Sequence, residues 1–177
     1  VIDAIRFRPT HSNIRAPGLG VGGYCLPKDP LFAPVSITSF YKDGSDDFPF
    51  SRLAIETNKN MPQHSVDRLK VLFQESLVEK KILICGVSYR QNVGDTRNSP
   101  SEFLVRCLEA ERACLDLHDP FVKYWDELSK EVLNKLPDIC DYDIVVLAVP
   151  HDDYIDIDIV NRATASRNSP FIFDLAN

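Results

Sequence analysis

The sequence lacks several features that would each point to a class of protein. Its five cysteines form no CxxC pair and are odd in number, which argues against a zinc knuckle, a disulfide framework or another metal site. No apolar run approaches the ~20 residues that a membrane span needs. No basic stretch followed by an apolar one indicates a signal peptide. We therefore expect a protein of a reducing, cytoplasmic compartment with no metal and no membrane partner.

Basic clusters are absent as well. The 20 Lys and Arg residues are scattered among 26 acidic residues, which gives a formal net charge of −6. Nucleic-acid binding depends on phosphate neutralisation by grouped Lys and Arg, so we expect no nucleic-acid partner. The hydrophobic content of 44% is enough for an ordinary packed core.

The second half of the sequence alternates strand-like and helix-like segments. Apolar runs predict strands at residues 81–86, 113–118, 143–149 and 171–175. Ser99 and Pro100 are typical of an N-cap and a first helical position, and further helices are expected over 125–136 and 154–162. This alternation predicts an α/β fold with a Rossmann-like, doubly wound parallel sheet covered on both faces.

A helical segment precedes that domain. Apolar residues at three- and four-residue spacing predict a helix over residues 48–73. Pro62 removes a backbone donor and crowds the preceding turn, so it is expected to kink or split this helix.

The most informative stretch is GLGVGGYCLPKDP at residues 18–30. Gly18, Gly20 and Gly23 satisfy the dinucleotide fingerprint GxGxxG, but no apolar strand precedes them. We therefore reject that reading. Closely spaced glycines instead let a backbone approach a ligand without interference from Cβ atoms.

These glycines lead to Cys25, which stands close to Lys28 and Asp29. A nearby ammonium lowers the pKa of a thiol, and the thiolate is the nucleophile. If a helical turn starts at Cys25, the Asp29 carboxylate returns to the same face and could act on a water molecule. A structural loop with an incidental thiol explains the same residues about equally well.

Motifs along the whole chain resemble the UDP-glucose/GDP-mannose dehydrogenase family. Residues 17–29 are similar to its active-site cysteine motif, and residues 54–62 to its central dimerisation helix. The other similar segments follow in the family's order at residues 86–90, 94–100, 118–120, 149–151 and 173–175.

The resemblance implies oxidation of the C6 alcohol of a nucleotide sugar to a carboxylate, with two NAD molecules consumed per sugar. Residues 1–78 would belong to a central helical dimerisation domain that carries the cysteine loop. Residues 79–177 would form the C-terminal UDP-binding domain. The sequence is thus expected to be the C-terminal part of a homodimeric enzyme whose NAD-binding domain lies outside it, so the fragment alone would be inactive.

The resemblance also implies roles for the cysteine loop. Cys25 would attack the C6 aldehyde to give a thiohemiacetal, whose loss of hydride leaves a thioester that water hydrolyses. Asp29 would help to activate the water, and Lys28 would lie near the nicotinamide of NAD. Gly20 and Gly22 would line the sugar pocket.

Three residues of the second half receive implied roles. Tyr89 and Arg90 would contact the substrate nucleotide and its diphosphate, and Arg97 would reach NAD. Independently, Arg90 and Arg97 follow the carboxyl end of a strand, where doubly wound folds bind ligands. The helix that begins after Ser99 would favour an anion at its N-terminus. An Asp95–Arg97 pair that stiffens the loop is the alternative, and His151 receives no role.

Two departures from the family leave the substrate open. Arg90 stands where the family usually has lysine, which changes the geometry of phosphate binding. Ala176 stands where the family commonly has arginine, so the sugar and the base stay undecided. Two other functions also remain: a non-catalytic nucleotide-binding and dimerisation module, and a hydrolase or acyl transferase that uses Cys25.

Overall fold

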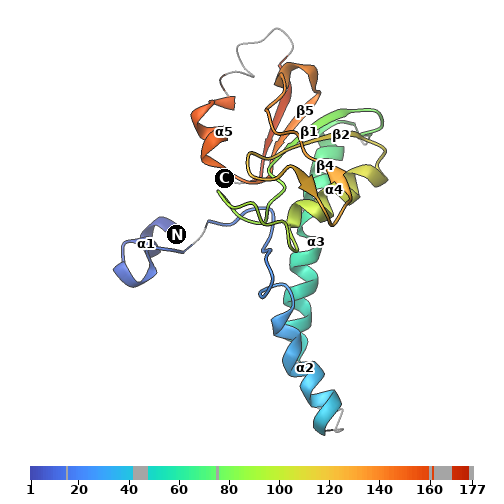
Figure 1. Ribbon diagram of the computed structural model, residues 1–177. Helices are drawn as coiled ribbons and strands as arrows, with labels where there is room; N and C mark the ends of the chain where they lie inside the picture. Colours follow the sequence, from blue (N-terminus) through green and yellow to red (C-terminus); the bar gives the residue numbers. More distant parts are fainter. Residues whose placement is uncertain (15, 42–47, 75, 160, 162–168, 176–177) are drawn as a thin grey trace.

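The computed structural model describes all residues except 15, 42–47, 75, 160, 162–168 and 176–177. A long helix, α3 (Pro49–Leu72), extends from a sheet-containing domain, and α2 (Phe32–Ser36) lies beside it (Figure 1). Helix α1 (Ile2–Arg6) lies apart from α3. The N-terminal part also contains the short helical turns Pro9–His11, Asp29–Leu31 and Ile37–Tyr41.

Four parallel strands form the sheet of the second half. They are β1 (Lys81–Cys85), β2 (Cys114–His118), β5 (Ile144–Leu147) and β6 (Phe171–Asp174), in the spatial order β2-β1-β5-β6. Ile82 of β1 lies opposite Leu115 of β2 and Ile144 of β5. The four predicted strands and the doubly wound class are confirmed.

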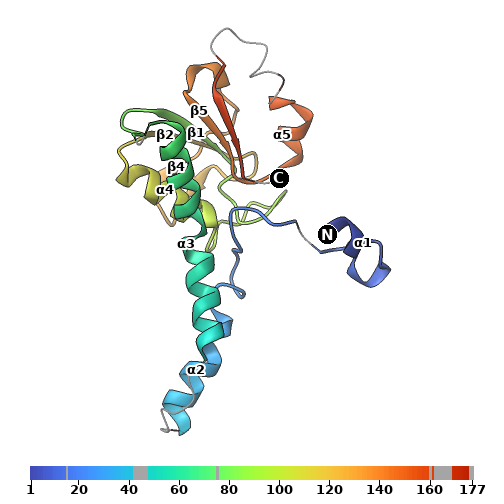
Figure 2. The ribbon, with the colours of Figure 1, turned by 180° about the vertical axis from the view of Figure 1, so that it is seen from behind.

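Side chains of the central strand alternate between two apolar clusters. Ile82 and Ile84 join the cluster that α3 and α4 (Pro100–Ala110) cover, whereas Leu83 and Cys85 join the cluster under α5 (Asp152–Asp156). Figure 2 shows α3 and α4 on one side of the sheet and α5 on the other. Strands that are buried on both faces read as continuous apolar runs, which explains why the sequence predicted them well.

The predicted start of α4 is confirmed. The Ser99 side chain accepts a hydrogen bond from the Ser101 N–H, and Pro100 takes the first helical position. The cap fixes the direction in which the chain leaves the loop after β1.

Helix α3 is continuous through Pro62, so the predicted split is wrong. Only Pro62, Val66 and Leu69 are buried along its 24 residues. The buried positions of the helix thus begin at Pro62, which the helix accommodates although proline donates no backbone hydrogen bond. No described helix has both the length and the apolar character that membrane crossing requires.

The predicted helix over 125–136 is wrong, since a hairpin of β3 (Tyr124–Trp125) and β4 (Lys130–Glu131) occupies this region. Trp125, Leu128 and Val132 have the spacing of a helix face, but they reach the core from the hairpin and the residue after it. Ser129 closes the turn with a positive φ of 51° and donates to the Asp126 carbonyl. Tertiary packing thus overrides the apparent period.

The predicted helix over 154–162 begins earlier than expected and is interrupted. Helix α5 starts at Asp152, where two acidic residues favour a helix N-terminus, and ends at Asp156. Asp158 has a positive φ of 52°, which interrupts the helical conformation, and residues 159 and 161 are helical again. Positions 160 and 162 lie outside the described residues.

Candidate functional site

The polar residues of interest gather at the carboxyl edge of the sheet, beside β1 and β5. The chain leaves β1 toward β2 on one side, whereas β5 lies on the other, so this is the switch point at which doubly wound folds bind ligands. The loop 86–99 follows β1, and His118–Asp119 and Val149–His151 follow the neighbouring strands.

The glycine segment docks onto this loop. The Gly23 N–H donates to the Arg97 carbonyl at 3.0 Å, and the Asn98 side chain donates to the Gly23 carbonyl at 3.2 Å. The segment that carries the predicted nucleophile is therefore attached to the loop that carries the predicted nucleotide-binding residues.

The structure gives the glycines a role within the chain. A Cβ atom at Gly22 would lie 2.7 Å from the Asn98 carbonyl oxygen and 2.7 Å from the Tyr89 Cβ. Gly23 has a positive φ of 91° and lies against the Tyr89 ring. Close approach between two segments of the protein, which the sequence reading did not consider, thus requires glycine here. It places Gly22 and Tyr89 in direct contact.

Asn58 of α3 fixes the same segment from the other side. Its side-chain amide accepts from the Val21 N–H and donates to the Val21 carbonyl, both at 2.7 Å. Sequence reasoning missed this role because residues 54–62 were assigned to dimerisation. A helical asparagine whose side chain pairs with a backbone 37 positions away leaves no local pattern.

Cys25 begins the helical turn that the sequence analysis considered. The N–H groups of Lys28 and Asp29 both donate to the Cys25 carbonyl, at 3.0 and 2.9 Å. Cys25 is exposed, and Asp29 follows one helical turn later, on the same side. The arrangement leaves the thiol open to a reactant, with a carboxylate nearby.

Lys28 is held by its neighbours. Its Nζ donates to Asp29 Oδ1 at 2.6 Å and lies 4.6 Å from the centre of the Tyr24 ring. The hydrogen bond to Asp29 is the largest influence that raises the pKa of Lys28, so this side chain remains a cation in neutral solution. The positive charge is therefore kept beside the cysteine turn.

Arg97 forms the pair with Asp95 that the sequence analysis gave as the alternative to a ligand-binding role. Its Nε donates to the two Asp95 carboxylate oxygens at 2.9 and 3.2 Å, and this side-chain hydrogen bond, opposed by slight burial, lowers the pKa of Asp95. The guanidinium also lies 5.4 Å from the centre of the Tyr24 ring. Lys28 and Arg97 thus share one aromatic neighbour, which brings the two predicted NAD contacts together.

Tyr89 and Arg90 lie at the start of the loop. The Tyr89 N–H donates to the Asp95 carbonyl at 2.9 Å, which closes the loop on itself. Tyr89 is half-buried against the glycine segment, whereas Arg90 is exposed. The guanidinium is accessible to an anion at the carboxyl edge.

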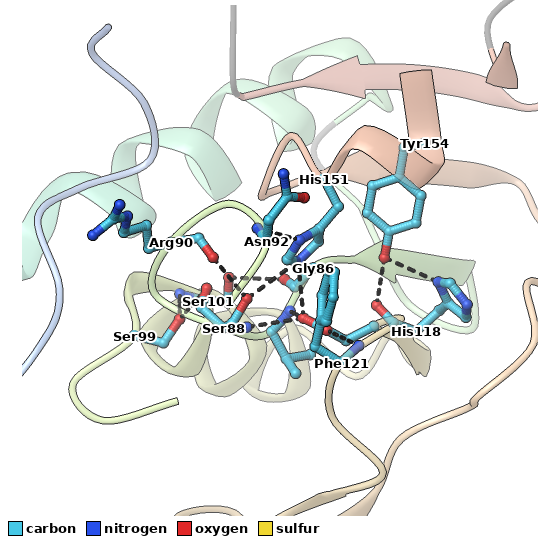
Figure 3. A network of polar contacts seen from close by, with 12 residues as sticks. Gly86, Ser88, Arg90, Asn92, Ser99, Ser101, His118, Phe121, His151 and Tyr154 are labelled. Atoms are coloured by element: carbon cyan, nitrogen blue, oxygen red, sulfur yellow. Dashed lines mark hydrogen bonds and ion pairs between the residues drawn. The ribbon is translucent and has the colours of Figure 1, made fainter. Parts of the chain in front are cut away.

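A buried polar network underlies the loop (Figure 3). Asp119 Oδ2 accepts from the N–H groups of Val87 and Ser88, at 2.9 and 3.1 Å, and lies 3.2 Å from His151 Nε2. Burial is the largest influence on Asp119 and favours a higher pKa, but hydrogen bonds from His151 and from backbone N–H groups outweigh it and lower the pKa. Asp119 therefore remains an anion inside the protein.

The N-terminus of α4 is closed by protein atoms. Ser99 and Ser101 are buried, and the Ser101 hydroxyl donates to the Gly86 carbonyl at 3.0 Å. The first-turn N–H groups of Ser101 and Glu102 are both satisfied by Ser99. The structure does not support the expectation of an anion at this helix end.

The loop after β1 does not carry the glycine fingerprint of a dinucleotide site. In that fingerprint a second and a third glycine follow the first at fixed spacing. Here Ser88 and Gln91 stand at those positions after Gly86, and Gly86 itself packs against Val149, whose Cβ an added Cβ atom would meet at 2.5 Å. The charges of Lys28 and Arg97, the two predicted NAD contacts, are paired with Asp29 and Asp95.

Two further observations lie outside this edge. A shallow depression at the amino end of β1 and β2 is lined by Lys81, Cys114 and Tyr142, and it contains none of the predicted site residues. Because ligands of this fold class bind at the opposite edge, we attach no function to it. Over the described ranges, no group of three His, Cys, Asp or Glu side chains is arranged to hold a metal ion.

Comparison with known proteins identifies the family. The sequence model of the UDP binding domain of the UDP-glucose/GDP-mannose dehydrogenase family matches residues 83–177. The chain belongs to this family, as its motifs suggested.

Relatives and solved structures agree with this assignment. UDP-N-acetyl-D-mannosamine dehydrogenases of Methanocaldococcus jannaschii and Methanococcus maripaludis strain S2 are 33% and 31% identical over the whole chain, which spans 39% and 40% of their lengths. The structure of a UDP-D-ManNAc dehydrogenase from Pyrococcus horikoshii superposes with a TM-score of 0.72, at 26% identity, over 99% of this chain and 40% of that one. The chain therefore spans about 40% of the length of such enzymes.

Proposed function

We propose that the chain is the C-terminal part of an NAD-dependent nucleotide-sugar 6-dehydrogenase, which oxidises the C6 alcohol of a UDP-sugar to a carboxylate. The observation that carries the proposal is the docking of the Cys25 segment onto the loop after β1, through the Gly23–Arg97 and Asn98–Gly23 hydrogen bonds. This contact joins a candidate nucleophile to a candidate nucleotide site within a chain of the dehydrogenase family.

Cys25 is the proposed nucleophile. Its thiol adds to the C6 aldehyde, and after oxidation the resulting thioester is hydrolysed by water, so that the aldehyde never leaves the protein. Asp29, one turn away, orients or deprotonates that water. Lys28 donates a hydrogen bond to Asp29 and supplies positive charge on the cofactor side, with Arg97 beside the same tyrosine ring.

NAD supplies the hydride acceptor when it is bound. Because the loop after β1 lacks the second and third fingerprint glycines, we assign the dinucleotide to a domain outside these 177 residues, with Lys28 and Arg97 at its edge.

The nucleotide end of the substrate is assigned to Tyr89 and Arg90. A tyrosine ring can stack on a base, and an arginine fork can bind a diphosphate through two parallel hydrogen bonds. Gly20 and Gly22 line the sugar end with backbone groups. The two methanogen relatives are named for a UDP-N-acetyl-D-mannosamine substrate, so an N-acetylated UDP-sugar is the first substrate to test.

We assign residues 1–78 to the dimerisation part and residues 79–177 to the UDP-binding part. Helix α3 exposes Phe50, Leu53 and Met61 before its buried portion begins. An exposed apolar row on a helix is typical of an interface, and a second copy of the chain is the proposed partner in a homodimer.

The test is the stoichiometry of NADH formed by the full-length protein with a limiting amount of each sugar. The panel contains UDP-N-acetylmannosamine, UDP-glucose, UDP-N-acetylgalactosamine and GDP-mannose. We expect two NADH per sugar with one UDP-sugar and none from the 177 residues alone. Turnover by the 177 residues with NAD would contradict the assignment of the cofactor to another domain.

A non-catalytic nucleotide-binding module is the second candidate. It is favoured by one observation, the absence of the dinucleotide fingerprint glycines from the loop after β1, because that loop then offers no site of this type for a hydride acceptor. Tight UDP binding by the full-length protein without NADH formation from any sugar of the panel would select it.

A further inference from the structure

We infer that His151 is a positioning residue for the substrate nucleotide, and that it acts by holding residues 91–92, the tip of the loop 86–99, in place. The inference rests on the proposed function, because that loop carries Tyr89 and Arg90. His151 itself is fully buried and touches neither the surface nor the cysteine turn.

The hydrogen bonds of His151 indicate which tautomer of the ring fits the site. The Asn92 N–H donates to Nδ1 at 2.9 Å, so Nδ1 carries no proton. Nε2 therefore carries the proton and faces Asp119 Oδ2 and the Ser88 hydroxyl, both at 3.2 Å. This tautomer pairs with one donor, the Asn92 N–H, and with two acceptors at once.

His151 supports the tip of the loop, whereas Asp119 supports its base. Asn92 has a positive φ of 57°, a conformation that needs support from its surroundings. Its N–H is held by His151, and its side chain donates to Asp152 Oδ2 at 2.6 Å. Gln91 also donates to Asp152, at 2.8 Å. The tip residues 91–92 are thus bound to His151–Asp152, just after Arg90.

The contacts of His151 allow an effect on the position of the loop to be distinguished from an effect on folding. The aromatic neighbours of His151 are Phe121 and Tyr154, at ring distances of 5.1 and 5.5 Å, and they would pack equally well on an apolar side chain of similar size. The polar contacts, in contrast, lead only to the loop and to its support Asp119. Loss of these contacts should therefore loosen the nucleotide site more than the sheet.

Three substitutions in the full-length protein test the role. His151→Leu removes both ring nitrogens. His151→Asn keeps an acceptor near the position of Nδ1, and His151→Gln keeps a donor near that of Nε2. We expect the dissociation constant for UDP, measured by titration calorimetry, to rise about tenfold in His151→Leu and His151→Gln, and by less than about threefold in His151→Asn.

Steady-state kinetics give a second readout. KM for the UDP-sugar should rise with the dissociation constant for UDP, by about tenfold in His151→Leu and by less than about threefold in His151→Asn. An equal loss of affinity in His151→Asn and His151→Leu would overturn the inference, as would unchanged affinity in folded His151→Leu.

A surface pair supplies the matched control. Asp152→Ala removes the carboxylate that accepts hydrogen bonds from the loop tip. Asp153→Ala changes the next residue, which is also exposed but accepts no hydrogen bond from the described residues of the loop. We expect weaker UDP binding in the first variant only. Equal binding by both variants would count against the tip as the positioned element.

Hydrogen exchange tests the inference without any ligand. The amides of residues 89–97 should exchange faster in His151→Leu than in the wild type, with β1 and β5 unchanged. Unchanged exchange in this loop would overturn the inference. A wild-type protein that fails to bind UDP would instead overturn the proposed function, so the two failures are distinguishable.

Discussion

Asn58 and Val21 are joined by two hydrogen bonds of 2.7 Å, through which a helix side chain pairs with both backbone groups of one glycine-flanked residue. The Asn58 amide thus satisfies both backbone groups of Val21, as a neighbouring strand would, in a segment that has no secondary structure of its own. It sets the distance between α3 and the turn that begins at Cys25.

Asn58→Ala should reduce kcat of the full-length enzyme, because two hydrogen bonds that hold the glycine segment are lost, at a cost of about 1–3 kcal/mol. The affinity for UDP should change little, since Tyr89 and Arg90 lie on the other segment. Asn60→Ala, an exposed change on the same helix, is the control for both measurements. A weakened affinity for UDP with normal kcat would argue against this role of Asn58.

Gly22→Ala should destabilise the docked segment by about 1–3 kcal/mol, as overpacking does elsewhere. The added Cβ would meet the Asn98 carbonyl oxygen and the Tyr89 Cβ at 2.7 Å. Gly18→Ala is the matched control, because its Cβ would approach only the Leu175 carbonyl oxygen, at 3.5 Å. Urea denaturation of both variants measures the difference, and equal midpoints would refute the tight contact.

Cys25→Ser should abolish net formation of the acid, since a hydroxyl does not replace a thiolate as nucleophile at neutral pH. Cys114→Ser changes the other fully exposed cysteine, at the start of β2, and should retain activity. Acid yield per sugar is the measurement. A normal yield from Cys25→Ser would remove this residue from the mechanism.

Asp119→Asn should lower the free energy of unfolding at pH 7 by about 1–3 kcal/mol, because an amide places a donor against donors in a buried site. The pKa of Asp119 is lowered by its hydrogen bonds, against the effect of burial, so its contribution to stability is present above the ordinary carboxyl pKa of about 4 and is lost as the pH falls further. The groups that face it are His151, neighbouring His118 and three backbone N–H groups.

The difference in stability between wild type and Asp119→Asn should therefore shrink below about pH 4. Denaturation series from pH 7 to pH 3 measure it. Asp126→Asn, an exposed change in the hairpin turn, should follow the wild type throughout. A difference that grows toward acid would mean that the pKa of Asp119 is raised instead.

Local sequence patterns were sufficient for the sheet and for α4. Strands 81–85 and 144–147 are apolar on both faces, and Ser99–Pro100 determines a helix start through contacts within a few residues. The hairpin at 124–131 was mistaken for a helix, because Trp125, Leu128 and Val132 have the spacing of a helix face. The hairpin turn contains Ser129 with a positive φ, and a serine in the sequence gives no indication of that conformation.

The candidate site was predictable only in part. Cys25, Lys28 and Asp29 lie within one turn, so their proximity follows from the sequence. Asn58 and His151 act on backbone groups 37 and 59 positions away, and nothing local marks such pairs. The role of Gly22 was likewise hidden, since its close neighbours are Tyr89, Asn98 and Pro100, which are far away in the sequence.

The contact between Gly23 and Asn98 joins positions 75 apart, which imposes an order on the assembly of the protein. During synthesis the cysteine turn emerges first, but its docking surface is complete only after the loop that follows β1 has been made and closed by Asp119 and His151. Contacts so distant in sequence form late, because the intervening chain must first be ordered. The Cys25 turn thus reaches its final position among the last steps of folding, when the domain that follows it is already ordered.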